Sequence, residues 1–172
     1  EKANVSKLTL YSHFADKEDL FAQSVIDCCE QQLPASSFQL PIGLNLEQAL
    51  IAIGIGFLDL VMDDKAISLH RMMVAQTNID IEHSELFFKA GPERMISEMQ
   101  ALLVKANDSG RLAIEQPKQA AQHFFCLLKG LSHMRVLMGL CKAPNKTSRE
   151  KHVKEVVALF IRAYQPTPTK NL

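Results

Sequence analysis

The sequence lacks an excess of charge of either sign and lacks any long apolar run. Lys plus Arg and Asp plus Glu both count 19, so a strongly basic nucleic-acid binder is not indicated, and any DNA-binding charge has to be local. The longest apolar run, Leu50–Leu58, is about half of the roughly 18 residues that a membrane span requires. A signal peptide is not visible. We therefore expect a cytoplasmic protein without a membrane partner.

Signatures of catalysis and of metal binding are also missing. The cysteines do not have the C-x-x-C spacing of a zinc or redox site, and the histidines do not have H-E-x-x-H spacing. A nucleophile elbow, a phosphate-binding glycine loop and a Cys–His signature are absent too. The sequence thus predicts no catalytic residue, no metal site, no cofactor and no enzyme. Reduced thiols are expected at Cys28, Cys29, Cys126 and Cys141.

Apolar residues recur at helical spacing along almost the whole chain, and 47% of the residues are hydrophobic, which is enough for a sizeable core. The clearest stripes lie within residues 20–28, 46–61, 95–106, 120–138 and 153–164. Pro34 and Pro166 follow the first and last stripes, and Pro117 suits the first turn of the fourth helix. This pattern predicts an all-α chain with a short helical head over residues 1–33 and a helical bundle over residues 34–172.

The stretch from Asn4 to Phe14 has the features of a short exposed helix. Asn4 tolerates the left-handed backbone of a tight turn, and Ser6 is a good N-cap. Leu10 and Phe14 are four residues apart, so both can be buried against neighbouring helices. Polar side chains occupy mainly the other faces, from Lys7, Thr9, Tyr11, Ser12 and His13.

A second helix is predicted to follow, with Asp16 as its N-cap and Asp19 at the acidic position of a capping box. The two helices then meet at a sharp corner, and the short polar helix lies on the outside. This arrangement is typical of a helix-turn-helix, whose second helix enters the major groove and contacts bases and phosphates. Lys7 and Lys17 supply the local positive charge that such a surface needs.

The run Val5-Ser6-Lys7-x-Thr9-Leu10-Tyr11-x-His13-Phe14-x-x-Lys17-Glu18-Asp19-Leu20-Phe21 closely resembles the recognition helix and the following helix of TetR-family repressors. The family usually has Gly at the position of Asn4, often Gly or Ala at that of Leu8, and commonly an aromatic residue at that of Ser12. Two further helices precede this motif in the family. The resemblance therefore implies that the sequence is truncated at its N-terminus.

The same resemblance assigns roles on the DNA. Lys7 and Thr9 are expected to read base edges, while Tyr11, His13 and Lys17 are expected to hold phosphates. The full set of implied DNA-binding residues is Ser6, Lys7, Thr9, Tyr11, Ser12, His13 and Lys17.

A looser resemblance covers roughly residues 65–165. The segments Phe87–Arg94, Asp108–Leu112 and Ala120–Phe124 look like the regulatory domain of the AcrR-like subgroup, which includes repressors of multidrug efflux pumps. This resemblance implies a body that binds a small, apolar effector.

The predicted bundle is rich in Met and Phe, and this composition has two interpretations. These side chains either pack a core or line a ligand pocket between helices, where adaptable Met and flat aromatic side chains accept apolar molecules. Gly54 and Gly56 in a predicted helix favour a kink or room for a ligand, because each weakens a helix interior. The candidate ligand-binding residues are Phe57, Met62, His70, Met73, Phe88, Met95, Met99 and Phe124.

The last two predicted helices, separated by a polar loop at residues 145–148, carry wide apolar stripes. Such stripes fit a buried monomer core, or a four-helix dimer interface of the kind that the resembled family forms. We favour the dimer because a helix-turn-helix repressor reads two half-sites. The candidate interface residues are Ala121, Phe124, Leu128, Leu131, Arg135, Val153, Val156, Val157 and Phe160.

Together these patterns predict a TetR-type repressor that binds a palindromic operator in double-stranded DNA as a homodimer and is released by a small, apolar ligand. The rival interpretation is a helical, dimeric small-molecule-binding protein without DNA binding. Only the motif at residues 4–21 separates the two.

Overall fold

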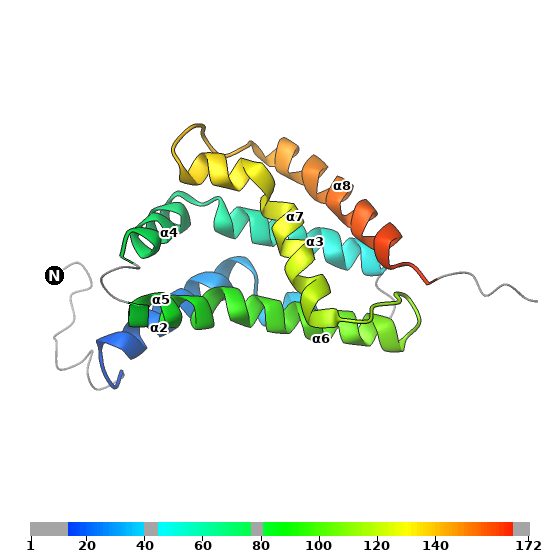
Figure 1. Cartoon of the computed structure of the whole chain (residues 1–172), viewed down its shortest axis with the longest axis horizontal. Coiled ribbons are helices and arrows are strands. Elements are labelled where there is room, and N and C mark those ends of the chain that lie inside the picture. The colour runs from blue at the N-terminus through cyan, green and yellow to red at the C-terminus, as the bar shows by residue number, and fades with distance from the viewer. Residues whose placement is uncertain (1–13, 40–44, 77–80, 167–172) are drawn as a thin grey trace, which may run out of the picture.

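The computed structural model describes residues 14–39, 45–76 and 81–166 (Figure 1). The elements are α2 (Lys17–Gln32), the short 3-10 helix η1 (Ala35–Phe38), α3 (Leu46–Val61), α4 (Asp64–Gln76), α5 (Ile81–Phe88), the π-helical turn η2 (Lys89–Glu93), α6 (Arg94–Asp108), α7 (Pro117–Leu137) and α8 (Lys146–Tyr164). No residue of these three ranges is in a β-strand. The all-α prediction is therefore confirmed.

Across the same ranges, no helix is both long and apolar enough to span a lipid bilayer.

Local side-chain caps fix several helix starts. Asp16 is the N-cap of α2, where its carboxylate accepts a hydrogen bond of 2.8 Å from the backbone N–H of Asp19. Asp19 in turn accepts a bond of 3.1 Å from the N–H of Ala15, so the predicted capping arrangement is present. Asn145 caps α8 by accepting from the N–H of Ser148. The prediction of a loop at residues 145–148 is therefore wrong, because Asn145 is the N-cap at which α8 begins.

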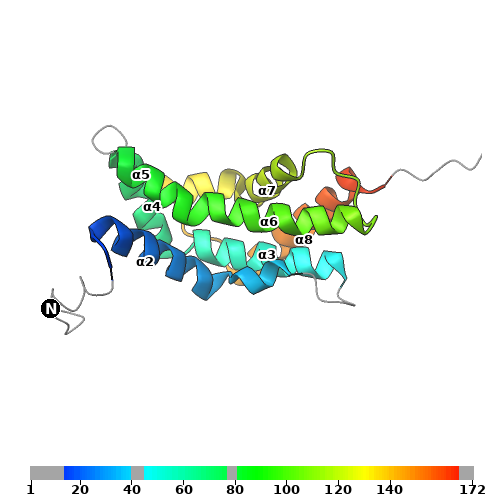
Figure 2. The same cartoon turned by 90° about the horizontal axis from the view of Figure 1, so that it is seen from below.

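The core lies where α3, α6, α7 and α8 meet. In Figure 1 the long helix α7 crosses from the layer of α6 toward α8, and Figure 2 shows α3 and α6 running along the length of the molecule. Phe124 of α7 and Phe160 of α8 are fully buried, with ring centroids 5.2 Å apart in an edge-to-face arrangement. Leu50 and Ile53 of α3 complete this centre. Each such side chain contributes roughly 1.5–3 kcal/mol by leaving water.

The two glycines of α3 allow close helix packing and not the predicted kink or ligand space. A Cβ on Gly54 would lie 2.7 Å from Cγ1 of Val153 on α8. A Cβ on Gly56 would lie 3.0 Å from a methyl group of Leu33, just after α2. Glycine is needed at both positions because neighbouring helices approach the backbone of α3 too closely for a side chain.

Helix α7 is broken at Gly130, a feature that the apolar stripe at residues 120–138 does not reveal. Gly130 has φ 47° and ψ −160°, a conformation that other residues strongly disfavour. Near the break, the carbonyl of Leu128 contacts Nε2 of His152 at 3.0 Å, which places His152 of α8 as its hydrogen-bond donor. The break redirects the second part of α7 along the edge of the molecule, as Figure 1 shows.

Helices α5 and α6 are joined through η2, so that Pro92 lies inside a continuous helical segment. Proline lacks the backbone N–H and clashes with the carbonyl of the preceding turn, and a π-turn relieves both problems. Gly91 next to it is buried, and a Cβ there would lie 3.4 Å from Val25 of α2. The π-turn thus brings the α5–α6 segment close to α2.

Candidate functional site

The predicted DNA-binding residues are mostly outside the described part of the chain. Six of the seven, Ser6, Lys7, Thr9, Tyr11, Ser12 and His13, lie within residues 1–13. The seventh, Lys17, is the first residue of α2 and is exposed.

A cavity of about 770 Å³ lies between α2 and the body. Its lining residues come from α2, α3, α4, α5, η2, α6 and α7. This volume is in the range of sites for drug-sized molecules, which are typically concave and mostly apolar. The cavity therefore qualifies as a binding site by size and by its position next to α2.

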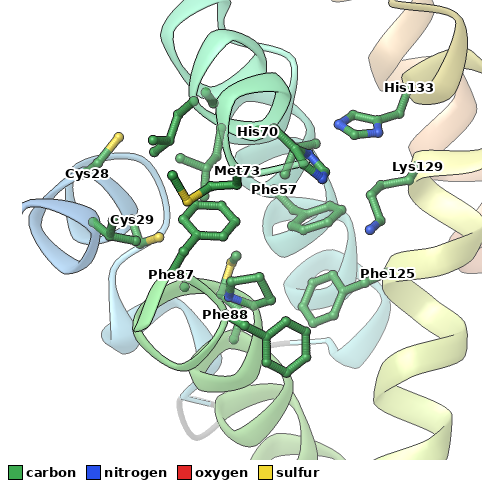
Figure 3. Close-up of a pocket in the computed structure, with 18 of the residues that line it drawn as sticks. Cys28, Cys29, Phe57, His70, Met73, Phe87, Phe88, Phe125, Lys129 and His133 are labelled. Carbon is green, nitrogen blue, oxygen red and sulfur yellow. The ribbon is translucent and has the colours of Figure 1, made fainter. Parts of the chain in front are cut away.

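Aromatic side chains form much of its wall (Figure 3). The rings of Phe57 on α3 and Phe125 on α7 are tilted against each other, with centroids 4.5 Å apart. Phe87 and Phe88 at the end of α5 face the same space, and Met73 of α4 lies beside Phe87. Such a wall suits a flat apolar molecule, because aromatic rings provide both area and defined stacking geometry.

Polar groups gather on one side of the cavity. His70 of α4 and His133 of α7 have ring centroids 5.5 Å apart, and Lys129 lies one turn before His133. Burial lowers the pKa of His133 to about 4, and the charges of Lys129 and His70 add to this effect, while a backbone hydrogen bond with Val61 opposes it. Burial and Lys129 also lower the pKa of His70. Both imidazoles are therefore mainly neutral at pH 7.

One hydroxyl group of the cavity wall is left without a partner. The Oγ of Ser84 on α5 is buried and finds no hydrogen-bond partner in the described part of the chain. Buried polar atoms are normally satisfied, and an unsatisfied one costs about 1–3 kcal/mol. A polar group of a bound molecule, or a water, can satisfy Ser84.

Helix α2 forms one wall of the cavity through Phe21, Ser24, Val25, Cys28 and Cys29. Burial, with a smaller effect of neighbouring Cys28, raises the pKa of the Cys29 thiol against the opposing charge of Arg94, so that this thiol stays protonated at neutral pH.

An ion pair between Glu30 of α2 and Arg94 of α6 fixes the far end of α2 to the body. Because α2 also lines the cavity, a molecule that fills it contacts the helix that follows the predicted DNA-binding segment.

The structure brings five of the eight predicted ligand-binding residues to this cavity, namely Phe57, His70, Met73, Phe88 and Met95. Met62, Met99 and Phe124 are not part of its lining and are buried in the core. Met62 ends α3, Met99 lies on the inner face of α6, and Phe124 packs between Phe125 and Phe160. Residue type alone could not separate these three from their cavity-lining neighbours, because both groups are apolar.

Sequence reasoning missed Lys129, His133 and Phe125 as cavity residues. A usable signal was present, because Phe125, Lys129 and His133 are spaced four apart on α7 and so share one helix face. A lysine in a stripe that is otherwise apolar indicates that the stripe borders something polar.

The predicted dimer residues divide into two groups. Leu131 and Arg135 are exposed on the second part of α7. The other seven are buried within a single chain, where they pack α7 and α8 against α3 and α6: Ala121, Phe124, Leu128, Val153, Val156, Val157 and Phe160. Burial in the monomer core accounts for these apolar side chains, and their role in a dimer interface stays a prediction.

The structure leaves Leu131 and five further apolar side chains exposed on and after α7 and on α8. Their exposed fractions reach 77% at Leu131 and 67% at Met138, and the set is Leu127, Leu131, Met134, Met138, Leu140 and Leu159. Exposed apolar side chains that gather on one part of a surface often mark a protein–protein contact.

Comparison with known proteins identifies the family. Residues 48–166 match the model of the AefR-like transcriptional repressor, C-terminal domain. A TetR-family transcriptional regulator from Mesorhizobium loti is similar in structure, with a TM-score of 0.79 and 25% identity over 96% of this chain and 83% of that one. The flavonoid-responsive regulator FrrA gives a TM-score of 0.75 and 28% identity over 95% of this chain and 83% of its own.

A third similar structure, a TetR transcriptional regulator from Agrobacterium tumefaciens, has a TM-score of 0.71 and 22% identity over 94% of this chain and 79% of its own, which supports the fold alone. Among curated proteins, none matches the chain. The matched family consists of transcriptional regulators and not of enzymes. The chain belongs to the TetR family and is a DNA-binding transcriptional repressor with an AefR-like C-terminal domain.

Proposed function

We propose that the repressor is released from its operator when a small, apolar effector fills the cavity beside α2. The observation that carries this proposal is the shared wall: α2 lines the cavity and directly follows the predicted DNA-binding segment. In functional terms, residues 1–33 form the DNA-binding part and residues 34–172 the part that binds ligand and dimerises. The protein would act on double-stranded operator DNA in the cytoplasm.

The coupling follows from what α2 contacts. It packs on α3, α5 and η2, and Glu30 pairs with Arg94 at the start of α6. An effector that fits better when α2 is displaced would favour that state in proportion to its difference in affinity. Displacing α2 in both subunits changes the separation of the two recognition helices, so they no longer match two half-sites.

The second subunit is proposed to bind over the exposed apolar side chains of α7 and α8. Figure 1 places these two helices together along one edge of the molecule. Leu131→Glu combined with Met138→Glu should convert a dimer into a monomer in sedimentation equilibrium, because two charges would be buried against an apolar partner. Ile81→Glu is the matched control, since Ile81 of α5 is also highly exposed but lies elsewhere. A dimer that survives the double change would remove this face from the interface.

The effector is proposed to be aromatic. The cavity wall of Phe57, Phe87 and Phe125 supports this choice, as does the similarity to a regulator whose name describes it as flavonoid-responsive. We also infer, from the resemblance of residues 65–165 alone, a place in the AcrR-like subgroup and thus control of an efflux function. An efflux gene under control of the operator would support that assignment.

DNA binding is tested by titrating the protein with DNA from upstream of its own gene at several salt concentrations. Tight, selective and salt-sensitive binding is expected. Lys17→Ala should weaken binding to selective and random DNA alike and should lower the salt slope by about one charge, because a phosphate contact carries no sequence information. Lys118→Ala, an exposed lysine of α7, is the control. Absence of selective binding would favour a helical small-molecule-binding protein instead.

A further inference from the structure

The charges around the cavity have one sign. Among the described residues that line it, Lys65 and Lys129 carry positive charge, and no Asp or Glu is present. The other polar side chains of the wall, among them His70, Ser84 and Gln122, carry no negative charge that would offset these cations. A neutral apolar effector would gain nothing from this arrangement, whereas an anionic one would.

Of the two cavity lysines, Lys129 says more about the charge of a ligand. It is half-buried on α7, immediately before the break at Gly130, and Figure 3 shows its amine directed into the space between Phe125 and His133. It forms no ion pair with an acidic group in the part of the chain that the structure describes. A partly desolvated ammonium without a counter-charge is unfavourable, and a bound anion would offset that cost.

The neighbours of Lys129 suit an acidic group attached to an aromatic body. The imidazoles of His70 and His133 flank the ammonium. The hydrogen bond of His133 with the backbone of Val61 uses its one N–H, so in the neutral forms it is His70 that can donate a hydrogen bond to a bound group. The rings of Phe57 and Phe125 lie just beyond them, where a flat ring can pack. At another wall, Ser84 holds an unsatisfied hydroxyl that can bind a second polar group.

We propose that the effector is an aromatic acid, with its ring system packed among Phe57, Phe87 and Phe125 and its anionic group paired with Lys129. This inference rests on the proposed function, since it assigns the chemistry of the effector of that same cavity. The proposed function requires only that the effector be apolar, whereas an aromatic acid also carries a negative charge at one end.

The test compares two fluorescent probes that differ only in charge. Anilinonaphthalene sulfonate is an aromatic anion, and phenylnaphthylamine is the same ring system without the sulfonate. The protein contains no tryptophan, so the probe emission is free of an indole background. Binding of each probe is titrated against the wild type, Lys129→Met and the control Lys118→Met, which removes an exposed lysine from the same helix.

We expect Lys129→Met to weaken binding of the anilinonaphthalene sulfonate by about tenfold or more, and to leave phenylnaphthylamine affinity within about twofold, because only the sulfonate forms a charge-assisted contact. Lys118→Met should change neither. Ala66→Phe, which places a large side chain in the cavity wall without introducing an indole, should reduce binding of both probes and so locate them there.

The alternative outcomes separate the two proposals. If both probes bind in the cavity but Lys129→Met weakens them equally or not at all, the anionic assignment is overturned while the apolar effector site stands. If Ala66→Phe leaves binding of both probes unchanged, the cavity is not a ligand site, and the proposed function fails together with this inference.

Discussion

The depressed pKa of His133 makes the stability of this protein depend on pH in a predictable way. His133 is buried beside the cavity, and its pKa falls from 6.5 to about 4 on folding. Between these two values the unfolded chain binds more protons than the folded one. The free energy of unfolding therefore has its full value above pH 6.5 and decreases as the pH is lowered toward 4.

The magnitude follows from the size of the shift. Each pKa unit corresponds to about 1.4 kcal/mol, so the complete effect is about 3 kcal/mol, of which about 2 kcal/mol is lost between about pH 7.5 and about pH 5. His70, whose pKa is also lowered, changes stability in the same direction. The total is a large part of the 5–15 kcal/mol typical of small domains.

The assay is urea unfolding followed by circular dichroism at several pH values and at one fixed protein concentration. His133→Gln should remove about 2 kcal/mol of the pH dependence, whatever its effect at neutral pH. Lys129→Met should reduce the dependence more modestly, because it removes the second cause of the shift. Val136→Ala, one turn farther along α7, should destabilise the protein without changing its pH dependence. An unchanged slope in His133→Gln would refute the reasoning.

Three further predictions concern the packing that positions the cavity. Gly54→Val should destabilise the protein by about 1–3 kcal/mol in urea unfolding, because its side chain would overlap Val153, and adding Val153→Ala should recover part of the loss. Gly130→Ala should cost more than about 1 kcal/mol in the same assay although a Cβ there meets nothing within 4 Å, because only its backbone conformation is strained. A double-mutant cycle of Glu30→Gln and Arg94→Met should give a coupling energy of about 1 kcal/mol, and additive effects would show that the pair does not hold α2.

Five of the helix positions and the cap of α2 could be predicted because they depend on short-range chemistry. The Asp16 and Asp19 carboxylates cap α2 as their spacing indicates, and the stripe that includes Leu50 and Ile53 forms α3. The family could be predicted from the motif at residues 4–21, even though most of it lies outside the described residues.

The partners of each apolar face could not be predicted in the same way. Helical periodicity shows that Phe124 and Phe125 belong to an apolar stripe, but they differ in function: Phe124 fills the core against Phe160, and Phe125 faces the cavity. The apolar stripe with Val153 and Val157 was predicted to form a dimer interface, and in the structure that face of α8 covers α3 within the monomer. Periodicity specifies which face of a helix avoids water, but not whether a core, a ligand or a second subunit covers it.

The sequence by itself therefore determined helices α2, α3, α6, α7 and α8, the cap of α2 and the DNA-binding family, because each is encoded in residues that are close along the chain. Only the tertiary structure decided the cavity, because its wall combines residues as distant as Phe21 of α2 and His133 of α7. It also decided the roles of Gly54, Gly130 and Lys129. A close helix contact, a helix break and a cation without a counter-charge are relations between elements, and they exist only once α3, α7 and α8 have packed together.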